Sequence, residues 1–209
     1  MEAVAIQKKA ANTPTAVFQE TAQKTVRPVS WPVFQKKYLT REDGFKYEWL
    51  DGRVEQTERT MSQTQLFILR NLLAAFRDLL IAGKVEGELL PESDLFFLKN
   101  HRRPDIVWLT NRQIDLLSVE TSREVPLFVI EVISNTDAYR KVAEKMGDYR
   151  AAGVQVVWHI HPNLEEVYVF SGSDLRQMTV CKGTDFASAA PVLASFDLPV
   201  SQIFKKPQL

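Results

Sequence analysis

The segment that is most informative about the fold is Leu127-Phe128-Val129-Ile130-Glu131-Val132-Ile133, in which one charged residue interrupts a hydrophobic run. A continuous apolar run of this kind is typical of a central β-strand whose sheet is covered on both faces. Glu131 would then lie in the interior, where an unpaired carboxylate costs several kcal/mol. We therefore expect Glu131 to be neutral, to bind a cation or to form a structural ion pair.

A second carboxylate occupies a similar place earlier in the chain. Asp105 opens the run Asp105–Leu109, whose other members are hydrophobic, and Pro104 suits the first position of a strand because it need not donate a ladder hydrogen bond. Alone, Asp105 is also explained by a turn before a strand. Together, two carboxylates on adjacent strands would supply the oxygen ligands that Mg²⁺ or Mn²⁺ prefers.

The residues that follow Glu131 predict a helix from about 137 to 152 and then a strand over 154–160. Lys141 and Lys145 are four residues apart on this helix, so they share a face, about 6 Å from each other. Helical side chains lean toward the N-terminus, so either ammonium could reach back toward Glu131. The other explanation is a solvated helix face.

The rest of the chain predicts a mixed α/β or α+β domain with helices around one central sheet. Asp51-Gly52 between two β-prone runs predicts a tight hairpin, and Ser62 caps a helix whose leucines recur at three- and four-residue steps. We divide the chain into a loose N-terminal arm, 1–31, and one domain, 32–209. The other expected elements are a helix over 32–38, three strands over 85–90, 94–98 and 105–109 that form a meander, a short helix over 111–117, a hairpin over 165–170 and 175–181, and a helix over 201–204.

Composition narrows the class of protein without naming a partner. The 209 residues carry 26 basic and 26 acidic side chains, so DNA would have to be met by a local basic patch. Cys181 is the only cysteine, which excludes an intramolecular disulfide and makes a cysteine nucleophile improbable in a peripheral strand. There is no secretory signal and no membrane-length apolar run, so we expect a cytoplasmic protein that does not enter membranes.

Several motifs in order resemble the Uma-type family of restriction-endonuclease-like proteins, which is common in cyanobacteria. The resemblance extends from about Pro32 to Phe204. Its motifs are Tyr47-Glu48-Trp49-Leu50-Asp51-Gly52-Arg53-Val54, Arg103-Pro104-Asp105-Ile106-Val107, Glu131-Val132-Ile133-Ser134, Lys145, Tyr149-Arg150-Ala151-Ala152-Gly153-Val154 and Val157-Trp158-His159-Ile160-His161-Pro162.

This resemblance implies a central mixed sheet flanked by helices and a divalent-cation-dependent endonuclease acting on DNA. It makes Asp105 and Glu131 the ligands of Mg²⁺ or Mn²⁺, Lys145 the catalytic lysine and Glu48 an additional acidic residue at the edge of the site. In the parent nuclease motif the lysine stands two residues after the second carboxylate, where this chain has Ile133. The family supplies the lysine from the following helix, and Lys141 competes with Lys145 for that role.

Other functions stay open on the sequence. The basic residues near the expected ligands, which could contact phosphates or be ordinary surface charge, are Arg102, Arg103, Arg140 and Lys141. A weak or inactive relative that binds nucleic acid or a protein partner is the main alternative, and a homodimer would suit the cutting of two strands. His159 and His161 alternate on one strand and could instead hold a transition metal.

Overall fold

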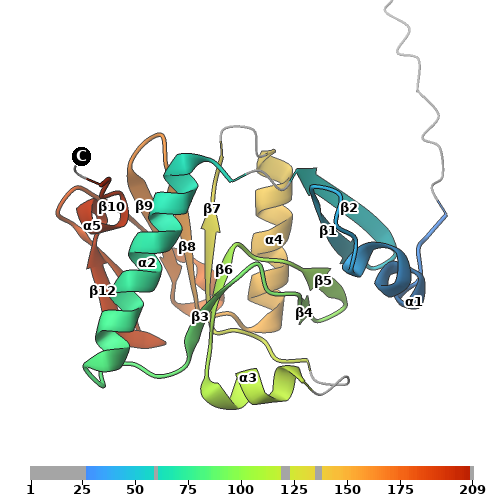
Figure 1. Ribbon diagram of the computed structural model, residues 1–209, viewed down its shortest axis with the longest axis horizontal. Coiled ribbons are helices and arrows are strands. Elements are labelled where there is room, and N and C mark those ends of the chain that lie inside the picture. The colour runs from blue at the N-terminus through green and yellow to red at the C-terminus, as the bar shows by residue number, and fades with distance from the viewer. Residues whose placement is uncertain (1–26, 59–60, 119–122, 135–137, 208–209) are drawn as a thin grey trace, which may run out of the picture.

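The computed structural model describes residues 27–58, 61–118, 123–134 and 138–207, which form a mixed α+β fold (Figure 1). The helices are α1 (Trp31–Phe34), α2 (Gln63–Ile81), α3 (Asn111–Leu117), α4 (Tyr139–Ala152) and α5 (Val200–Ile203), with a π-helical turn η1 (Gln35–Leu39) and a 3₁₀ turn η2 (Ser173–Leu175). The strands are β1 (Phe45–Leu50), β2 (Arg53–Glu58), β3 (Glu88–Pro91), β4 (Leu95–Phe97), β5 (Asn100–Arg102), β6 (Ile106–Leu109), β7 (Phe128–Val132), β8 (Val156–His161), β9 (Glu166–Ser171), β10 (Gln177–Lys182), β11 (Phe186–Ala189) and β12 (Leu193–Pro199).

The central sheet has six strands in the order β10-β9-β8-β7-β6-β3. Its β7–β8 pair is parallel and the other neighbouring pairs are antiparallel. A parallel pair needs a crossover connection, which α4 provides. The predicted strand, helix and strand after residue 127 are therefore confirmed, and the hydrophobic run does form a central strand.

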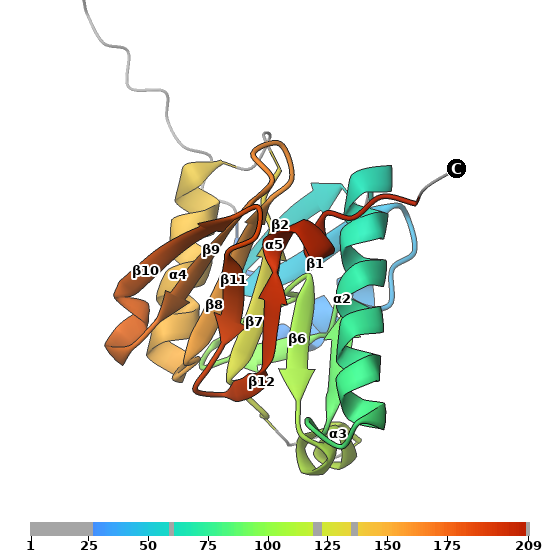
Figure 2. The same ribbon diagram turned by 90° about the vertical axis from the view of Figure 1, so that its left-hand side faces the viewer.

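Both faces of this sheet are covered, as Figure 2 shows. Ile130 and Trp158 face a core that includes α2, β11, β12 and α5, whereas Val129 and Val157 face a second core that includes α4 and β4. Side chains alternate along a strand, so Glu131 shares the face of Val129 and points toward α4. The fold therefore brings the buried carboxylate and the lysine-bearing helix together.

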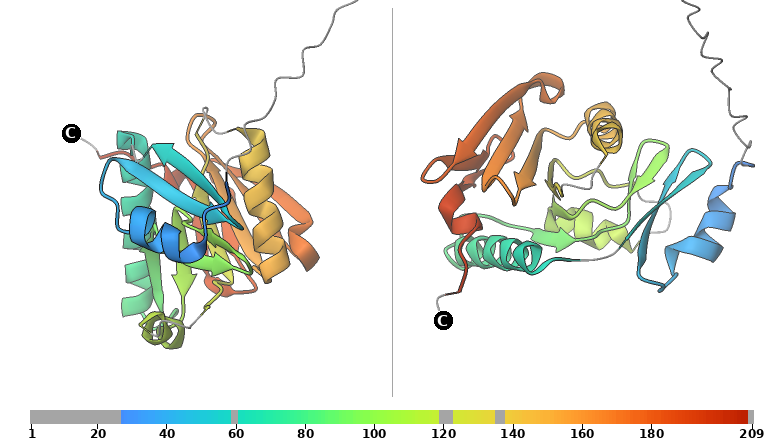
Figure 3. Two further views of the ribbon diagram at one scale, coloured as in Figure 1. Left: turned by 90° about the vertical axis from the view of Figure 1, so that its right-hand side faces the viewer. Right: turned by 90° about the horizontal axis from the view of Figure 1, so that it is seen from above.

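A second sheet, in the order β2-β1-β5-β4, lies with α1 at one end of the molecule (Figure 3). The hairpin predicted around Asp51-Gly52 is confirmed, and both residues have positive φ, 46° and 98°. Residues 1–26 of the expected arm lie outside the described part of the chain. The end of that arm contacts the hairpin, because Val29 N donates to Gly52 O at 2.8 Å and its carbonyl accepts from Trp49 Nε1 at 2.6 Å.

The expected three-stranded meander is wrong. β3 pairs with β6 in the central sheet, but β4 between them pairs with β5 in the second sheet. The strand β5 was not predicted, because His101 and Arg102 give it the composition of a surface loop although both are buried. These polar side chains are buried with partners in other elements, which no local pattern reveals.

Helix α2 and the small β11–β12 sheet cover the face of the central sheet that carries Ile130 and Trp158. The helix cap predicted at Ser62 is confirmed, since its hydroxyl accepts from Gln65 N at 3.2 Å, and the two residues form a capping box. The small β11–β12 sheet was not predicted, yet it carries Phe196, which is fully buried and stacks on Trp158 with ring centroids 5.5 Å apart. Among the described residues, no helix is both long enough and apolar enough to cross a membrane.

Candidate active site

Glu131 lies on β7 beneath α4 and is 4% exposed. Its two carboxylate oxygens lie 3.0 and 3.1 Å from Lys145 Nζ, and one of them also accepts a hydrogen bond from the Tyr149 hydroxyl. Burial raises the pKa of Glu131, and the nearby Asp105 carboxylate raises it further against the opposing charge of Lys145. The carboxylate therefore needs positive charge beside it in order to stay ionised.

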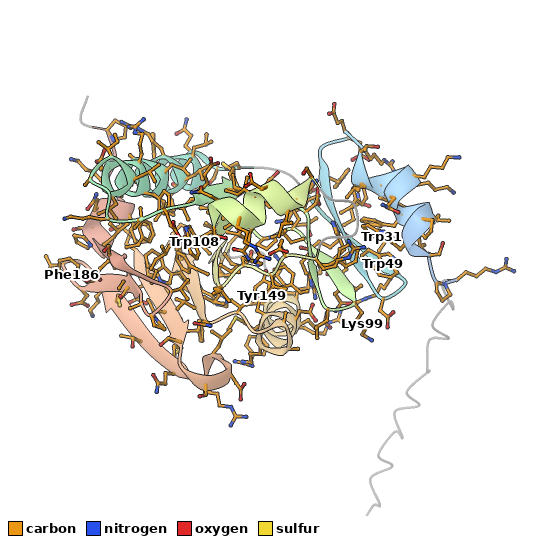
Figure 4. All side chains as sticks on the ribbon, turned by 90° about the horizontal axis from the view of Figure 1, so that it is seen from below. Trp31, Trp49, Lys99, Trp108, Tyr149 and Phe186 are labelled. Carbon is orange, nitrogen blue, oxygen red and sulfur yellow. The ribbon has the colours of Figure 1, made fainter. Side chains whose placement is uncertain are left out.

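Lys145 and Tyr149 reach Glu131 together because they are four residues apart on one face of α4. Tyr149 is fully buried and points from α4 into the molecule (Figure 4). Lys145 Nζ also lies 3.8 Å from Glu48 Oε1. Burial would lower the pKa of Lys145, but Glu131, Glu48 and Asp105 raise it above its ordinary value, so this side chain is an ammonium at neutral pH.

Asp105 comes immediately before β6, the strand that pairs with the Glu131 strand β7. Ile106 pairs with Ile130, so the register places Asp105 beside Glu131 at the same end of the two strands. One oxygen of Asp105 accepts from Val132 N at 2.8 Å, and the other lies 3.1 Å from Lys46 Nζ. Although burial acts to raise the pKa of Asp105, the two lysines and this hydrogen bond lower it. The Asp105 side chain is 34% exposed, compared with 5% for Glu131.

Glu48 joins the second sheet to this cluster from β1. It accepts from Arg102 Nη1 at 3.0 Å and from Arg103 N at 2.8 Å. Burial alone would raise the pKa of Glu48, but Lys145, Lys46 and Arg102 bring it down to about 2. Glu48 is therefore negatively charged at neutral pH and forms a second ion pair with Lys145, in addition to that of Glu131.

The structure contradicts the expectation that Arg102 contacts DNA. Its side chain is 2% exposed and also donates to Asp148 at 2.7 Å, so it binds α4 to the second sheet. Arg103 makes two hydrogen bonds to Asp94, at 2.9 and 2.6 Å. Arg140 is open, with a 72% exposed side chain 3.6 Å from Glu144. Of these arginines, Arg140 is the one that a phosphate can reach freely.

Lys141 lies one turn before Lys145 on α4. In the described residues, the ion pairs of Glu131 and Asp105 involve Lys145 and Lys46 but not Lys141. The helix face thus presents two lysines, of which Lys145 contacts the buried carboxylate.

His159 is the β8 neighbour of Glu131 in the parallel register, and burial lowers its pKa to about 4. The rings of His159 and His161 are 6.4 Å apart, with His159 packed on Phe170 at 4.8 Å. Within the described ranges, no group of three histidine, cysteine, aspartate or glutamate side chains is arranged to hold a metal ion. The histidines therefore gain no support as a transition-metal site.

The donor chemistry of Asp105 and Glu131 nevertheless suits a hard dication. Two anionic oxygen donors stand on adjacent strands, one of them open to solvent, and water or phosphate oxygens can complete the coordination of Mg²⁺. The two ammonium groups already show that this group of carboxylates stabilises positive charge. The residues present thus fit such an ion through two ligands.

Sequence reasoning assigned no role to Lys46 or Tyr149, although simple spacing points to both. Lys46 is two residues before Glu48 on a strand, so the two share a face. Tyr149 is four residues after Lys145 on a helix. These two spacings are visible in the sequence. They point to the site only once the structure shows that Glu48 and Lys145 lie together.

Comparison with known proteins gives a family match and a structure of similar fold. A family model described as "Uma2: Putative restriction endonuclease" matches residues 31–201. The crystal structure of "a putative nuclease belonging to DUF820" from Anabaena variabilis is similar in fold, with a TM-score of 0.67 and 19% sequence identity, covering 85% of this chain and 98% of that one. A comparison with curated proteins finds no match.

Proposed function

Because the chain belongs to the Uma2 family of restriction-endonuclease-like proteins, we propose that it is a divalent-cation-dependent endonuclease that hydrolyses DNA phosphodiester bonds. The observation that supports this most is the convergence of Asp105, Glu131 and Lys145. Two carboxylates lie side by side at one end of adjacent strands, and an ammonium lies 3.0 Å from one of them. Such a group can serve a reaction in which negative charge develops on a phosphate.

Asp105 and Glu131 would hold Mg²⁺ or Mn²⁺. When bound, the ion would lower the pKa of a water molecule and offset charge on the phosphate. Asp105 is the more open of the two carboxylates, so it would meet the incoming ion and the substrate first. Glu131, fixed by the Tyr149 hydroxyl, would keep its direction during turnover.

Lys145 would act as an electrostatic group and not as a base. Its pKa is raised above the ordinary value by three carboxylates, so it carries a proton throughout the physiological range. An ammonium donates hydrogen bonds and accepts none, so it can orient an attacking water or stabilise charge on the phosphate. Glu48 forms a further ion pair with it, at 3.8 Å.

DNA contacts would come from the beginning of α4, where Arg140 is exposed and Lys141 follows. The balanced net charge gives no general attraction to a polyanion, so these contacts would be local. Cleavage of both strands of a duplex is favoured by two sites, which a homodimer would supply. Sedimentation velocity of the full chain measures the mass of the particle in solution. A protein that stays monomeric with and without DNA would reject the homodimer.

A binding protein without nuclease activity is the second candidate. It is favoured by one observation, that Asp105 and Glu131 are each already paired with an ammonium, as in a stable charge network. Such a protein would slow the migration of DNA in an electrophoretic shift assay but would leave the DNA uncut when Mg²⁺ or Mn²⁺ is added.

Plasmid cleavage in the presence of Mn²⁺ tests the proposed function. We expect the wild type to nick or linearise the plasmid, and Asp105→Asn, Glu131→Gln and Lys145→Met each to lose at least about a hundredfold in rate. Lys99→Met is the matched control, because Lys99 forms an exposed pair with Asp51 at 2.6 Å outside the site. Equal cleavage by all five proteins would indicate contamination and would remove the catalytic assignment.

A further inference from the structure

Lys46 is the basic side chain at the site that has no role in the function proposed above. It stands two residues before Glu48 on β1, so both side chains project from the same face of the second sheet toward Asp105 and Lys145. The Lys46 side chain is 11% exposed. A lysine this deeply covered has given up most of its hydration, which requires compensation from a specific partner.

That partner is the Oδ1 oxygen of Asp105. Lys46 Nζ lies 3.1 Å from Asp105 Oδ1, while Oδ2 accepts the hydrogen bond of Val132 N. The fold therefore holds Oδ2 with a backbone hydrogen bond and Oδ1 with the ammonium of a side chain. Oδ1 is the oxygen that an approaching dication would use, and Lys46 covers it.

The two lysines of the site are held unequally. Lys145 lies between Glu131 and Glu48, whereas in the described residues the ion pair of Lys46 is with Asp105. Without the Asp105 contact, Lys46 would lack a direct ion pair among the described residues, whereas Lys145 would keep those to Glu131 and Glu48. The four-carbon stem of Lys46 would let its ammonium turn away from Asp105 and still remain inside the site.

We propose that Lys46 occupies the place of the divalent cation on Asp105 until the ion displaces it, and that its ammonium then contacts the scissile phosphate. An ammonium and a dication repel each other, so they cannot share Oδ1. The phosphate brings new negative charge into the site, and a compact point charge such as an ammonium is suited to it. No bond to Lys46 forms or breaks in this role.

This role rests on the proposed function, and it predicts two effects of opposite sign. Removal of the Lys46 charge should strengthen metal binding, because a competitor is gone, and should weaken cleavage, because a phosphate contact is gone. A merely structural lysine would not do both, since its loss would weaken both or neither.

Isothermal titration of the full chain with Mn²⁺ separates these possibilities. We expect Lys46→Met to bind Mn²⁺ at least about fivefold more tightly than the wild type, the lower end of ordinary coupling between two ligands. Lys46→Gln is the second variant in case the first unfolds, and a thermal melt reports folding for each. Lys99→Met is the control and should bind Mn²⁺ as the wild type does, while Asp105→Asn should lose the binding.

Cleavage at saturating Mn²⁺ completes the test. We expect Lys46→Met to cut plasmid at least about tenfold more slowly than the wild type despite its tighter metal binding. Equal or weaker Mn²⁺ affinity in both folded Lys46 variants would overturn this role for Lys46 and leave the proposed function standing. Tighter affinity with unchanged cleavage would overturn the phosphate contact. Absence of Asp105-dependent Mn²⁺ binding in the wild type and in both variants would overturn this role together with the proposed metal site.

Discussion

Lys145 on α4 contacts both carboxylate oxygens of Glu131 on β7, at 3.0 and 3.1 Å, although the two residues are 14 positions apart in sequence. The contact depends on the crossover, because α4 returns over the face of the sheet to which Glu131 points. It explains how a charged residue is tolerated in an apolar strand. It also means that a change in α4 is felt directly at the carboxylate.

Tyr149→Phe should separate positioning from packing. The ring contacts Phe97 with centroids 4.8 Å apart, and phenylalanine keeps that contact while removing the hydroxyl that donates to Glu131. We expect a loss of about 1 kcal/mol in the free energy of unfolding. We also expect weaker Mn²⁺ binding and about tenfold slower cleavage, because Glu131 is no longer held in one direction. Urea titration, calorimetry and plasmid cleavage measure the three effects, and unchanged Mn²⁺ affinity would contradict a positioning role.

Glu48 should make stability depend on acid pH. Its pKa is about 2 in the folded protein, below its ordinary value of 4.5, so ionised Glu48 stabilises the fold above about pH 4.5. This stabilisation, on the order of 3 kcal/mol, is lost as pH falls from about 4.5 toward 2. Urea midpoints measured across this range should therefore fall more steeply in the wild type than in Glu48→Gln. Parallel curves for the two proteins would show that Glu48 is not the responsible carboxylate.

Arg102 and Arg140 should behave oppositely, since one is buried and the other is exposed. We expect Arg102→Met to cost about 3 kcal/mol or more of stability, because Glu48 and Asp148 lose a buried partner. Arg140→Ala should change stability by about 0.5 kcal/mol or less, yet lower the salt dependence of DNA binding. Thermal melts and binding isotherms at several salt concentrations measure both. A stable Arg102→Met variant with reduced DNA affinity would restore Arg102 as a phosphate contact.

Much of the fold could be predicted from local patterns. The strand around Glu131, the hairpin at Asp51-Gly52 and the capped helix at Ser62 each follow from apolar periodicity or turn chemistry within a few residues. The strand β5 could not be predicted in this way, because the burial of Arg102 depends on Glu48 and Asp148 in other elements. The partition of strands between two sheets depends on the same distant pairing.

The two carboxylates of the candidate site could be predicted from the sequence, but only one of its two lysines could. Asp105 and Glu131 stand out because each is a charge in an apolar run, whereas helix spacing offered both Lys141 and Lys145, and the family resemblance selected Lys145. Lys46 has no such contrast, since it lies in a strand that alternates aromatic and charged residues, a pattern typical of any strand with one solvated face. Its place at the site comes from β1 approaching the end of β6, a property of the tertiary fold that the spacing between Lys46 and Glu48 does not specify by itself.

The most direct test of the central claim, that Asp105 and Glu131 jointly bind a hard dication, is the anomalous scattering of a crystal soaked in Mn²⁺. We expect one strong peak in contact with a carboxylate oxygen of each residue, with Lys46 withdrawn from Asp105. A peak elsewhere, or no peak while Lys46 and Lys145 still hold both carboxylates, would contradict it.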